Sequence, residues 1–368
     1  MNLALSVAAV LHDRMDVRWS LRPHVDSAYL GWTNRGNLGD EAMFHAARVT
    51  SGSEMRRVPL HAPGRALAVR GRCRVLVVGG GTLLGRPEWL ERAVAARKLL
   101  RPDRTIVLGT GVEPLEFGSL RGTTDPRTAA ATAEFLRKCD FVGVRGPRSL
   151  EELNRHDVAA TVIGDPALAL RPSRRHEPAG GVIAVNLAAV TNGEDQSRER
   201  TTREVLNAAH LFAKEGRRVM FFAMERVDEH HIRDLTRGRY EVLPWADDVG
   251  RLIRFLDDAD AVLSERLHGG ILAAARGTPF IQIGYKPKIH DFAESIGASS
   301  LVVTPRNLDG HDLAKRVKEA ADGGLPEIVS HAVEALSDTY RKAVSEQVGH
   351  PLDQPNLRHH FGEASNDR

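Results

Sequence analysis

The sequence predicts an α/β protein built from two doubly wound, Rossmann-like domains that face each other across a cleft. Short apolar runs recur along the chain, and each is followed by turn residues and then by a helical pattern. Runs that are apolar throughout are typical of parallel strands covered by helices on both faces of a sheet. This pattern stops at a polar, proline-punctuated stretch, residues 171–178, and then begins again. At 368 residues the chain is also longer than one compact core usually serves.

The order of the predicted elements divides the chain into two similar halves. The first half has predicted strands at 27–30, 75–78, 105–108 and 141–144, helices at 41–49, 89–100 and 149–153, and an end near 161–166. The second half has predicted strands at 182–185, 218–222, 261–263 and 280–283, helices at 203–215, 230–236, 252–256 and 271–276, and a helix-and-strand unit over 289–303. We therefore expect domains at 1–175 and 176–350, followed by a polar tail at 351–368.

The composition is that of a soluble globular protein, with 42% hydrophobic and 27% charged residues. Aromatic residues make up only 5% of the chain, which argues against a platform for stacking nucleic-acid bases. The formal net charge is +3, and the sequence contains no basic block of the kind that marks a nucleic-acid tail. We therefore expect no nucleic-acid partner, and the mild positive excess would help to steer a small anionic substrate.

The two cysteines, Cys73 and Cys139, are far apart and belong to no Cys-x-x-Cys pair. This spacing predicts neither a disulfide nor a cysteine-based zinc site, and it fits a reducing cytoplasm. The apolar stretch at 3–11 lacks a basic flank and a cleavage site, so we expect an N-terminal helix rather than a signal peptide. No apolar run is long enough to span a bilayer, so any membrane contact would be peripheral. The sequence leaves homo-oligomerisation open.

Two glycine-rich loops follow predicted strands in the first half. The loop 31–41 contains Asn37, Gly39 and Asp40, and the second loop contains Gly80 and Gly81. Backbone N–H groups and a helix N-terminus can receive an anion at this position. Asp40 has two interpretations, a helix cap and a catalytic carboxylate, and the residues alone do not separate them. The sequence contains neither a P-loop nor a Gly-x-Gly-x-x-Gly dinucleotide pattern.

The most informative element is the run Leu-Ser-Glu-Arg-Leu-His-Gly-Gly at 263–270, where a strand ends and a helix is expected to start near 270. Arg266 suits bidentate binding of a carboxylate or phosphate, and His268 can donate or accept a proton near neutral pH. The alternative is an arginine paired with a core carboxylate and a histidine bonded to the backbone. Both interpretations remain open at the level of the residues.

Further charged residues have both a functional and a structural interpretation. Arg145 follows a strand of the first half and could reach the cleft, although a surface ion pair is the commoner role. Lys286 lies in a cationic loop that could contact an anion or could simply be solvated. We expect no metal site, because the adjacent residues His230 and His231 point in different directions on a helix. The acidic pair at 228–229 is most simply interpreted as a helix N-terminal cap.

Taken in order, these motifs resemble the polysaccharide pyruvyltransferase family over about residues 28–297. The motifs are GNLGDE at 36–41, GGGTLL at 79–84, GTGVEPL at 109–115, VR at 144–145 with Ser149, GDPA at 164–167, RLH at 266–268 with GTP at 277–279, and YKPK at 285–288. The chain departs from many members at 184–188, where they carry an arginine and this chain reads Ala-Val-Asn-Leu-Ala. The polar stretch at 189–200 is also unlike a typical member.

The resemblance implies a glycosyltransferase-B-like (GT-B-like) fold, with the acceptor on the first domain and the donor on the second. It implies transfer of pyruvyl from phosphoenolpyruvate to a saccharide, with ketal formation and phosphate release, in the synthesis of an exopolysaccharide, a cell-wall glycan or a related glycoside. Arg266 and Arg145 would bind the donor, His268 would be the acid, and Asp40 the base at the attacking hydroxyl. Other residues would line the substrate site, namely Leu267, Asn37, Gly39, Gly80, Gly81 and Lys286. Nothing in this scheme requires a metal or a redox cofactor.

Two other functions compete with this interpretation. A nucleotide-sugar glycosyltransferase could share the fold, and it would bind a UDP- or GDP-sugar in the cleft. A catalytically inactive scaffold for glycan assembly would release no phosphate, and a His268→Ala substitution would leave its function unchanged.

Overall fold

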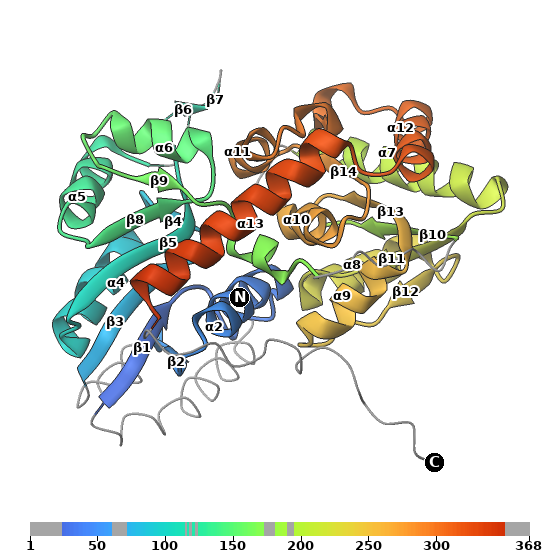
Figure 1. The fold of residues 1–368 in the computed structure, drawn as a ribbon. Helices are drawn as coiled ribbons and strands as arrows, with labels where there is room; N and C mark the ends of the chain where they lie inside the picture. Colours follow the sequence, from blue (N-terminus) through green and yellow to red (C-terminus); the bar gives the residue numbers. More distant parts are fainter. Residues whose placement is uncertain are drawn as a thin grey trace, which may run out of the picture.

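The computed structural model describes residues 24–60, 72–114, 124–172, 181–189 and 195–349, together with the short strands β6 (Glu116–Phe117) and β7 (Leu120–Arg121). The predicted helix at 3–11, most of the linker at 171–178 and the predicted tail at 351–368 lie outside these residues. Two α/β halves, each with its own parallel sheet, make up the fold (Figure 1). The predicted boundary near residue 175 therefore falls between the two sheets.

The first sheet has seven strands, in the order β2-β1-β3-β5-β8-β9 with β4 paired to β5. All of these pairs are parallel. Val75, Leu76 and Val77 in its centre are fully buried, as expected for a strand covered on both faces. The strands are β1 (His24–Leu30), β2 (Met55–Arg57), β3 (Arg72–Gly79), β4 (Thr82–Leu84), β5 (Arg104–Val112), β8 (Phe141–Val144) and β9 (Thr161–Val162).

Local signals in the sequence set the ends of the helices in this half. Asn37 and Asp125 cap α2 and α5 with their side chains, and a proline opens each of α4, α5 and α6. Gly52 ends one helix in the left-handed conformation, which glycine adopts at little cost. The helices are α2 (Leu38–Ser51), α4 (Pro87–Leu100), α5 (Pro126–Leu136) and α6 (Pro147–Asn154).

The second sheet has six parallel strands, in the order β12-β11-β10-β13-β14-β15. Its strands are β10 (Val182–Asn186), β11 (Arg218–Phe222), β12 (Glu241–Leu243), β13 (Ala259–Ser264), β14 (Phe280–Ile283) and β15 (Val302–Val303). The helices of this half are α7 (Asp195–Lys214), α8 (Arg226–Thr236), α9 (Val249–Asp257), α10 (Leu267–Arg276), α11 (Pro287–Ser295), α12 (Gly310–Gly323) and α13 (Glu327–Gln347). The strand order reverses direction between β10 and β13, and such switch points are where ligands bind in these sheets.

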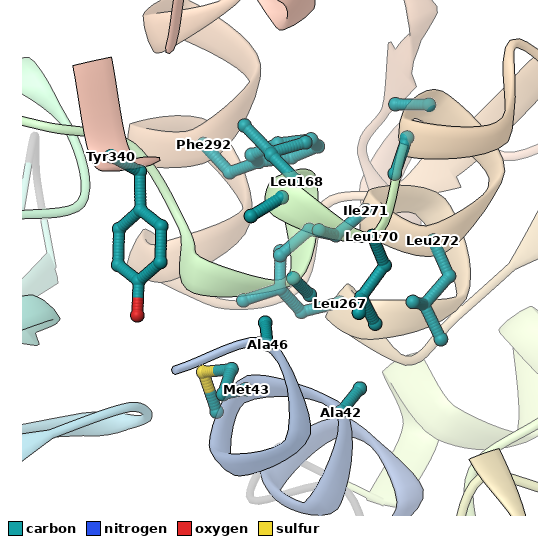
Figure 2. Close-up of a cluster of buried hydrophobic side chains, with 14 of the residues drawn as sticks. Ala42, Met43, Ala46, Leu168, Leu170, Leu267, Ile271, Leu272, Phe292 and Tyr340 are labelled. Atoms are coloured by element: carbon teal, nitrogen blue, oxygen red, sulfur yellow. The ribbon is translucent and has the colours of Figure 1, made fainter. Parts of the chain in front are cut away.

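One buried apolar cluster joins the two halves. It combines Met43 of α2, Leu168 of the 3₁₀ segment η2 (Pro166–Leu170), Leu267 of α10 and Phe292 of α11. Figure 2 shows these side chains converging from both halves around η2. Because one continuous core spans the junction, the carboxyl ends of the two sheets are held in a defined relation.

The last helix, α13, returns to the first half and crosses its sheet (Figure 1). The guanidinium of Arg104 donates to the backbone carbonyl of Gln347 at 3.2 Å, and that of Arg74 donates to the carbonyl of Val348. On the same helix, Tyr340 is fully buried in the shared core (Figure 2). Thus α13, which the sequence division places in the second domain, also ties that domain to the first.

Candidate active site

Chemically active side chains from both halves meet where the carboxyl ends of the two sheets face each other. Helices α2, α8, α10 and α11 all begin at this place, each directly after a strand or its loop. Helix α10 contacts both α2 and α11. Helix N-termini carry partial positive charge and unpaired N–H groups, so this junction favours a negatively charged ligand.

Arg266 is held rigidly at the N-terminus of α10. Its backbone N–H donates to Oδ1 of Asn186 at 2.9 Å, a side chain at the end of β10. Its Nε and Nη2 donate to the two carboxylate oxygens of Asp228 at 3.1 and 2.7 Å, and its Nη1 lies 2.9 Å from Glu225 Oε1. Burial lowers the pKa of Arg266, but the hydrogen bonds and charges of these two carboxylates outweigh burial and raise it above its usual value. Since a guanidinium has five N–H donors, two are left for a ligand.

Asp228 is fully buried and is a site residue that the sequence analysis assigned only to a helix cap. The cap is present, because Asp228 accepts from the backbone N–H of Glu225 at 3.0 Å. Its second and larger role is the paired hydrogen bond to Arg266. Arg266 is thus paired with a core carboxylate, which was the structural interpretation of this arginine in the sequence. The Arg266 side chain is still 16% exposed.

His268 lies in the first turn of α10, which begins at Leu267 rather than near residue 270 as expected. Its Nε2 lies 3.6 Å from Asp165 Oδ2, just beyond hydrogen-bond length, and its side chain is 10% exposed. Gly39 packs directly on the other side, since a Cβ there would be 2.2 Å from Nδ1. Burial lowers the pKa of His268 from its usual 6.5, and the cations Lys288 and Arg145 lower it further, whereas Asp165 raises it.

Arg145 lies at the base of the site and is only 1% exposed. Its Nη2 donates to Thr82 Oγ1 at 3.1 Å, and its Nη1 lies 3.6 Å from Asp165 Oδ2. Gly111 leaves room for the guanidinium, because a Cβ there would be 2.4 Å from Nη2. Its Nε and Nη1 are buried without a hydrogen-bond partner among the described residues. Buried donors of this kind are costly unless a ligand satisfies them.

Asp40 is not the cap of α2. Asn37 fills that role, since its Oδ1 accepts from the N–H groups of Gly39 and Asp40 at 2.9 and 3.3 Å. The Asp40 side chain therefore does not cap the helix. Burial raises the pKa of Asp40 to about 8, and the positive charge of Lys288 opposes this shift. Burial also lowers the pKa of Lys288 to about 8, helped by Lys286 and opposed by Asp40. Both groups can therefore exchange a proton close to neutral pH.

The remaining predicted residues lie around this centre with differing contacts. A Cβ added at Gly81 would lie 3.5 Å from Asp40 Oδ1, so this glycine is close to that carboxylate. The backbone N–H of Gly81 donates to the sulfur of Met43. Gly80 adopts a φ of +74°, and a side chain there would meet the Tyr29 hydroxyl. Leu267 is buried in the shared core (Figure 2), so its backbone alone is left to face a ligand.

Asn37 and Lys286 lie at the contact between the two halves. The Asn37 side chain donates to Glu225 Oε1 at 3.0 Å, and the two residues form an isolated antiparallel bridge. Lys286 precedes α11, with its ammonium 5.4 Å from the ring centre of Tyr285. Glu225 thus connects the N-terminus of α2 to Arg266.

Among the described residues, no group of three or more His, Cys, Asp or Glu side chains is arranged to hold a metal ion. The histidines at 230 and 231 belong to no such group. Within the same part of the chain, no helix combines the length and the apolar character needed to cross a membrane.

Sequence comparison identifies the family. Residues 33–287 match the family model described as polysaccharide pyruvyl transferase. The chain belongs to the polysaccharide pyruvyl transferase family. Membership makes it a transferase, as the order of its motifs predicted. No curated protein matches the chain.

Solved structures similar to this family member share its architecture. A putative UDP-N-acetylglucosamine 2-epimerase from Listeria monocytogenes matches with a TM-score of 0.56 and 10% identity, over 88% of this chain and 96% of that one. The UDP-N-acetylglucosamine 2-epimerase from Rickettsia bellii matches with a TM-score of 0.52 and 11% identity, over 88% and 96%. The UDP-GlcNAc 2-epimerase from Methanocaldococcus jannaschii gives 0.50 and 10%, over 86% and 99%. At this identity the likeness concerns the fold alone, and it confirms the GT-B-like arrangement.

The structure brings four further residues to this place: Asp165, Glu225, Asp228 and Lys288. The sequence analysis included Lys288 only as part of the cationic loop at 285–288, which could contact an anion or could simply be solvated. Asp165 and Lys288 belong to the motifs GDPA and YKPK, so their place in the motif was the available signal. Glu225 and Asp228 had no such signal, because they lie in a helix start whose acidic residues look like ordinary caps.

Proposed function

We propose that the protein transfers the pyruvyl group of phosphoenolpyruvate to two hydroxyls of a saccharide, forming a cyclic ketal and releasing phosphate. The observation that carries this proposal is that Lys288 and the buried Arg145 lie near His268, and that Arg266 lies near Lys288 at the start of the same helix as His268. A donor with both a phosphate and a carboxylate needs several fixed cations. A proton donor beside them is what its enol carbon requires.

The cationic groups come from both domains and have different partners. Arg266 is anchored by Asp228 and Glu225 and still has two N–H donors, which suits one face of a phosphate or carboxylate. Arg145 has unpartnered donors at the base of the site, which a second anionic group would satisfy. Lys286 directly precedes α11 and Lys288 lies in its first turn, so both add positive charge near the N-terminus of that helix.

His268 acts as the acid in this scheme. Alone, the imidazole is neutral near pH 7 because burial lowers its pKa. Arrival of the anionic donor favours the protonated form, since a nearby opposite charge stabilises imidazolium. The proton passes to the methylene carbon of phosphoenolpyruvate, and C2 then carries the positive charge that a hydroxyl oxygen attacks.

Asp40 acts as the base at the attacking hydroxyl. A carboxyl with a pKa of about 8 is a strong enough base to accept that proton once ionised, and Lys288 helps to ionise it. The C2–O bond to phosphate then breaks, and phosphate leaves toward the arginines. The second hydroxyl closes the ketal ring and gives its proton to the released phosphate, while the proton on Asp40 returns to His268 through solvent. Fixed charges and helix N-termini stabilise the departing phosphate.

The acceptor is a saccharide of an exopolysaccharide, a cell-wall glycan or a related glycoside, held on the first domain. The second domain holds the donor, with Arg145 of the first domain reaching across to it. We place the reaction in the cytoplasm, where phosphoenolpyruvate is available. Neither Cys73 nor Cys139 forms a disulfide, which is consistent with that location.

The rival enzyme function is glycosyl transfer from a nucleotide sugar, which the shared GT-B-like architecture suggests. In that case a carboxylate of the second domain should receive the ribose hydroxyls. Two carboxylates near the end of β11, Glu225 and Asp228, are instead engaged by Arg266. We therefore place the pyruvyl transfer first.

The test is thermal stabilisation of the purified full chain by phosphoenolpyruvate, compared with inorganic phosphate, UDP-N-acetylglucosamine and GDP-mannose. A ligand that binds only the folded state raises Tm, because at a concentration of 100 times its Kd it adds about 2.7 kcal/mol to the free energy of unfolding. We expect phosphoenolpyruvate to raise Tm for the wild type and for Arg254→Ala, an exposed arginine on α9, but not for Arg266→Ala. Stabilisation by a nucleotide sugar alone would support glycosyl transfer, and stabilisation by none of the four would support an inactive scaffold.

A further inference from the structure

We propose that Asp165 is a positioning residue that holds His268 and Arg145 from one carboxylate oxygen and provides the negative charge against which His268 takes up its proton. This inference rests on the proposed function, because it assigns the imidazole to proton transfer. Asp165 lies directly before η2, in the segment that leads from the first domain to the second.

The two oxygens of Asp165 have separate roles. Oδ1 accepts from the backbone N–H of Ala167 at 2.9 Å, which caps η2 and fixes the orientation of the carboxylate. Oδ2 lies 3.6 Å from His268 Nε2 and 3.6 Å from Arg145 Nη1. One oxygen therefore faces a residue of each domain at the same distance.

None of the three facing atoms has another hydrogen-bond partner among the described residues. Asp165 Oδ2, His268 Nε2 and Arg145 Nη1 are all buried and unpartnered. Asp165 itself is fully buried. A small approach of these groups, of the kind that catalytic hydrogen bonds often show when substrate binds, would pair Oδ2 with both of its neighbours.

A cap alone does not explain a charged residue here. An asparagine would cap η2 equally well through its Oδ1, without the cost of burying a charge. Burial indeed raises the pKa of Asp165, but His268, Arg145 and the Ala167 N–H together bring it below its usual value. The carboxylate is therefore ionised, and its charge is directed at the imidazole and the guanidinium.

The surroundings of His268 make this charge necessary for an acid. Cations face the imidazole from two elements, Lys288 on α11 and Arg145 after β8, and both disfavour imidazolium. Arg266 precedes His268 as the N-cap residue of α10, and from α2 the neighbour is Gly39, followed by Asp40. Asp165 is thus the ionised carboxylate that favours a proton on His268.

The test uses Asp165→Asn, which keeps the cap and removes the charge. The pKa of His268 is measured by NMR on the full chain labelled with ¹³C,¹⁵N-histidine, and His268→Gln identifies the signal. We expect the pKa of His268 to fall by about one unit or more in Asp165→Asn. A matched control is Asp125→Asn, which removes the charge from the exposed cap of α5 and should leave the pKa unchanged.

A pKa of His268 that stays within about 0.2 unit in folded Asp165→Asn would overturn the proposal, since a shift from a facing charge is larger. If that variant does not fold, wild-type protein labelled with ¹³C-aspartate replaces it. In a pH titration, the carboxyl chemical shift of one aspartate that is already ionised must then change at the pH where His268 titrates. That change must be absent in His268→Gln. The absence of such a signal would overturn the proposal as well.

A kinetic measurement separates this role from a merely structural one. If His268 is the acid, kcat/KM for phosphoenolpyruvate falls as pH rises through its pKa, and Asp165→Asn moves this limb to lower pH. If Asp165→Asn lowers kcat/KM equally at every pH and the fall in kcat/KM stays at the same pH, Asp165 has a structural role only and the proposal is rejected. Failure of the proposed function would appear differently, as absent turnover with the NMR shift of His268 intact.

Discussion

The guanidinium of Arg266 and the carboxylate of Asp228 meet in a paired hydrogen bond, Nε to Oδ2 at 3.1 Å and Nη2 to Oδ1 at 2.7 Å. Asp228 is fully buried, and it also accepts from the backbone N–H of Ala189 at 2.8 Å. The arginine therefore presents its remaining donors in one fixed direction. An arginine fixed in this way loses less side-chain entropy when it binds an anion.

Asp228→Asn tests this arrangement. The substitution removes the charge of one of the two carboxylates paired with the buried Arg266 and leaves only Glu225. We therefore expect a loss on the order of 3 kcal/mol in the free energy of unfolding. We also expect the Tm increase caused by phosphoenolpyruvate to shrink, because Arg266 is no longer oriented. Urea unfolding and thermal shift measure the two effects. Asp234→Asn, an exposed aspartate on the same helix, should change neither.

Gly39→Ala tests the packing of α2 against the imidazole of His268, the proposed acid. A Cβ at residue 39 would lie 2.2 Å from Nδ1 and 2.4 Å from Cγ of His268, so the ring must move. We expect a loss of about 1–3 kcal/mol in stability from overpacking and a fall in kcat of about 100-fold from the displaced ring. Gly323→Ala, in α12 with nothing within 4 Å, is the control and should be neutral or slightly stabilising. Wild-type kcat in Gly39→Ala would contradict the role of His268.

Asp291→Ala tests the contact between the two domains. Asp291 lies on α11, and its Oδ1 accepts from the N–H groups of Arg148 and Ser149 at the start of α6, at 2.9 and 3.3 Å. Its Oδ2 accepts from the Ser149 hydroxyl at 2.7 Å. It thus caps a helix of the other domain, and we expect its loss to cost about 1–2 kcal/mol.

The same substitution should also loosen the domains, which hydrogen exchange of the α6 backbone would detect. Asp309→Ala removes the cap of α12, where the N–H groups of His311 and Asp312 donate at 3.0 Å within one domain. It should cost similar stability and leave α6 protected. Equal exchange of α6 in both variants would show that Asp291 does not connect the domains.

His268→Gln tests the pH dependence of stability. Burial lowers the pKa of His268 below the value of 6.5 that it has in an unfolded chain. As pH falls through 6.5, the unfolded state binds the proton first, so the free energy of unfolding decreases until the folded state is protonated too. The variant lacks this loss, and below pH 6.5 its slope should be smaller by up to about 1.4 kcal/mol per pH unit. Urea titrations from pH 7 to 5 measure it, with the exposed His331→Gln as the control.

The sequence was sufficient to predict most of the elements and the end of the second sheet at which the Arg-Leu-His element lies. The apolar runs at 75–78 and 261–263 lie within β3 and β13, and the Arg-Leu-His element follows β13 as predicted. These features are local, since strand pattern, turn residues and the position of a motif after a strand depend on neighbours in the chain. The start of α10 was placed too late, because Arg266 in extended conformation already ends the loop.

Tertiary structure alone decided which groups face each other. Asp228 looks like a cap in the sequence and becomes the partner of Arg266 only because β11 and β13 both flank β10. Asp165 comes between Arg145 and His268 because η2 packs between α2 and α10. The sequence by itself determined the alternation of strands and helices, because each depends on nearby residues. The charges around His268 were set by burial and by contacts between residues far apart in the chain, which no local pattern encodes.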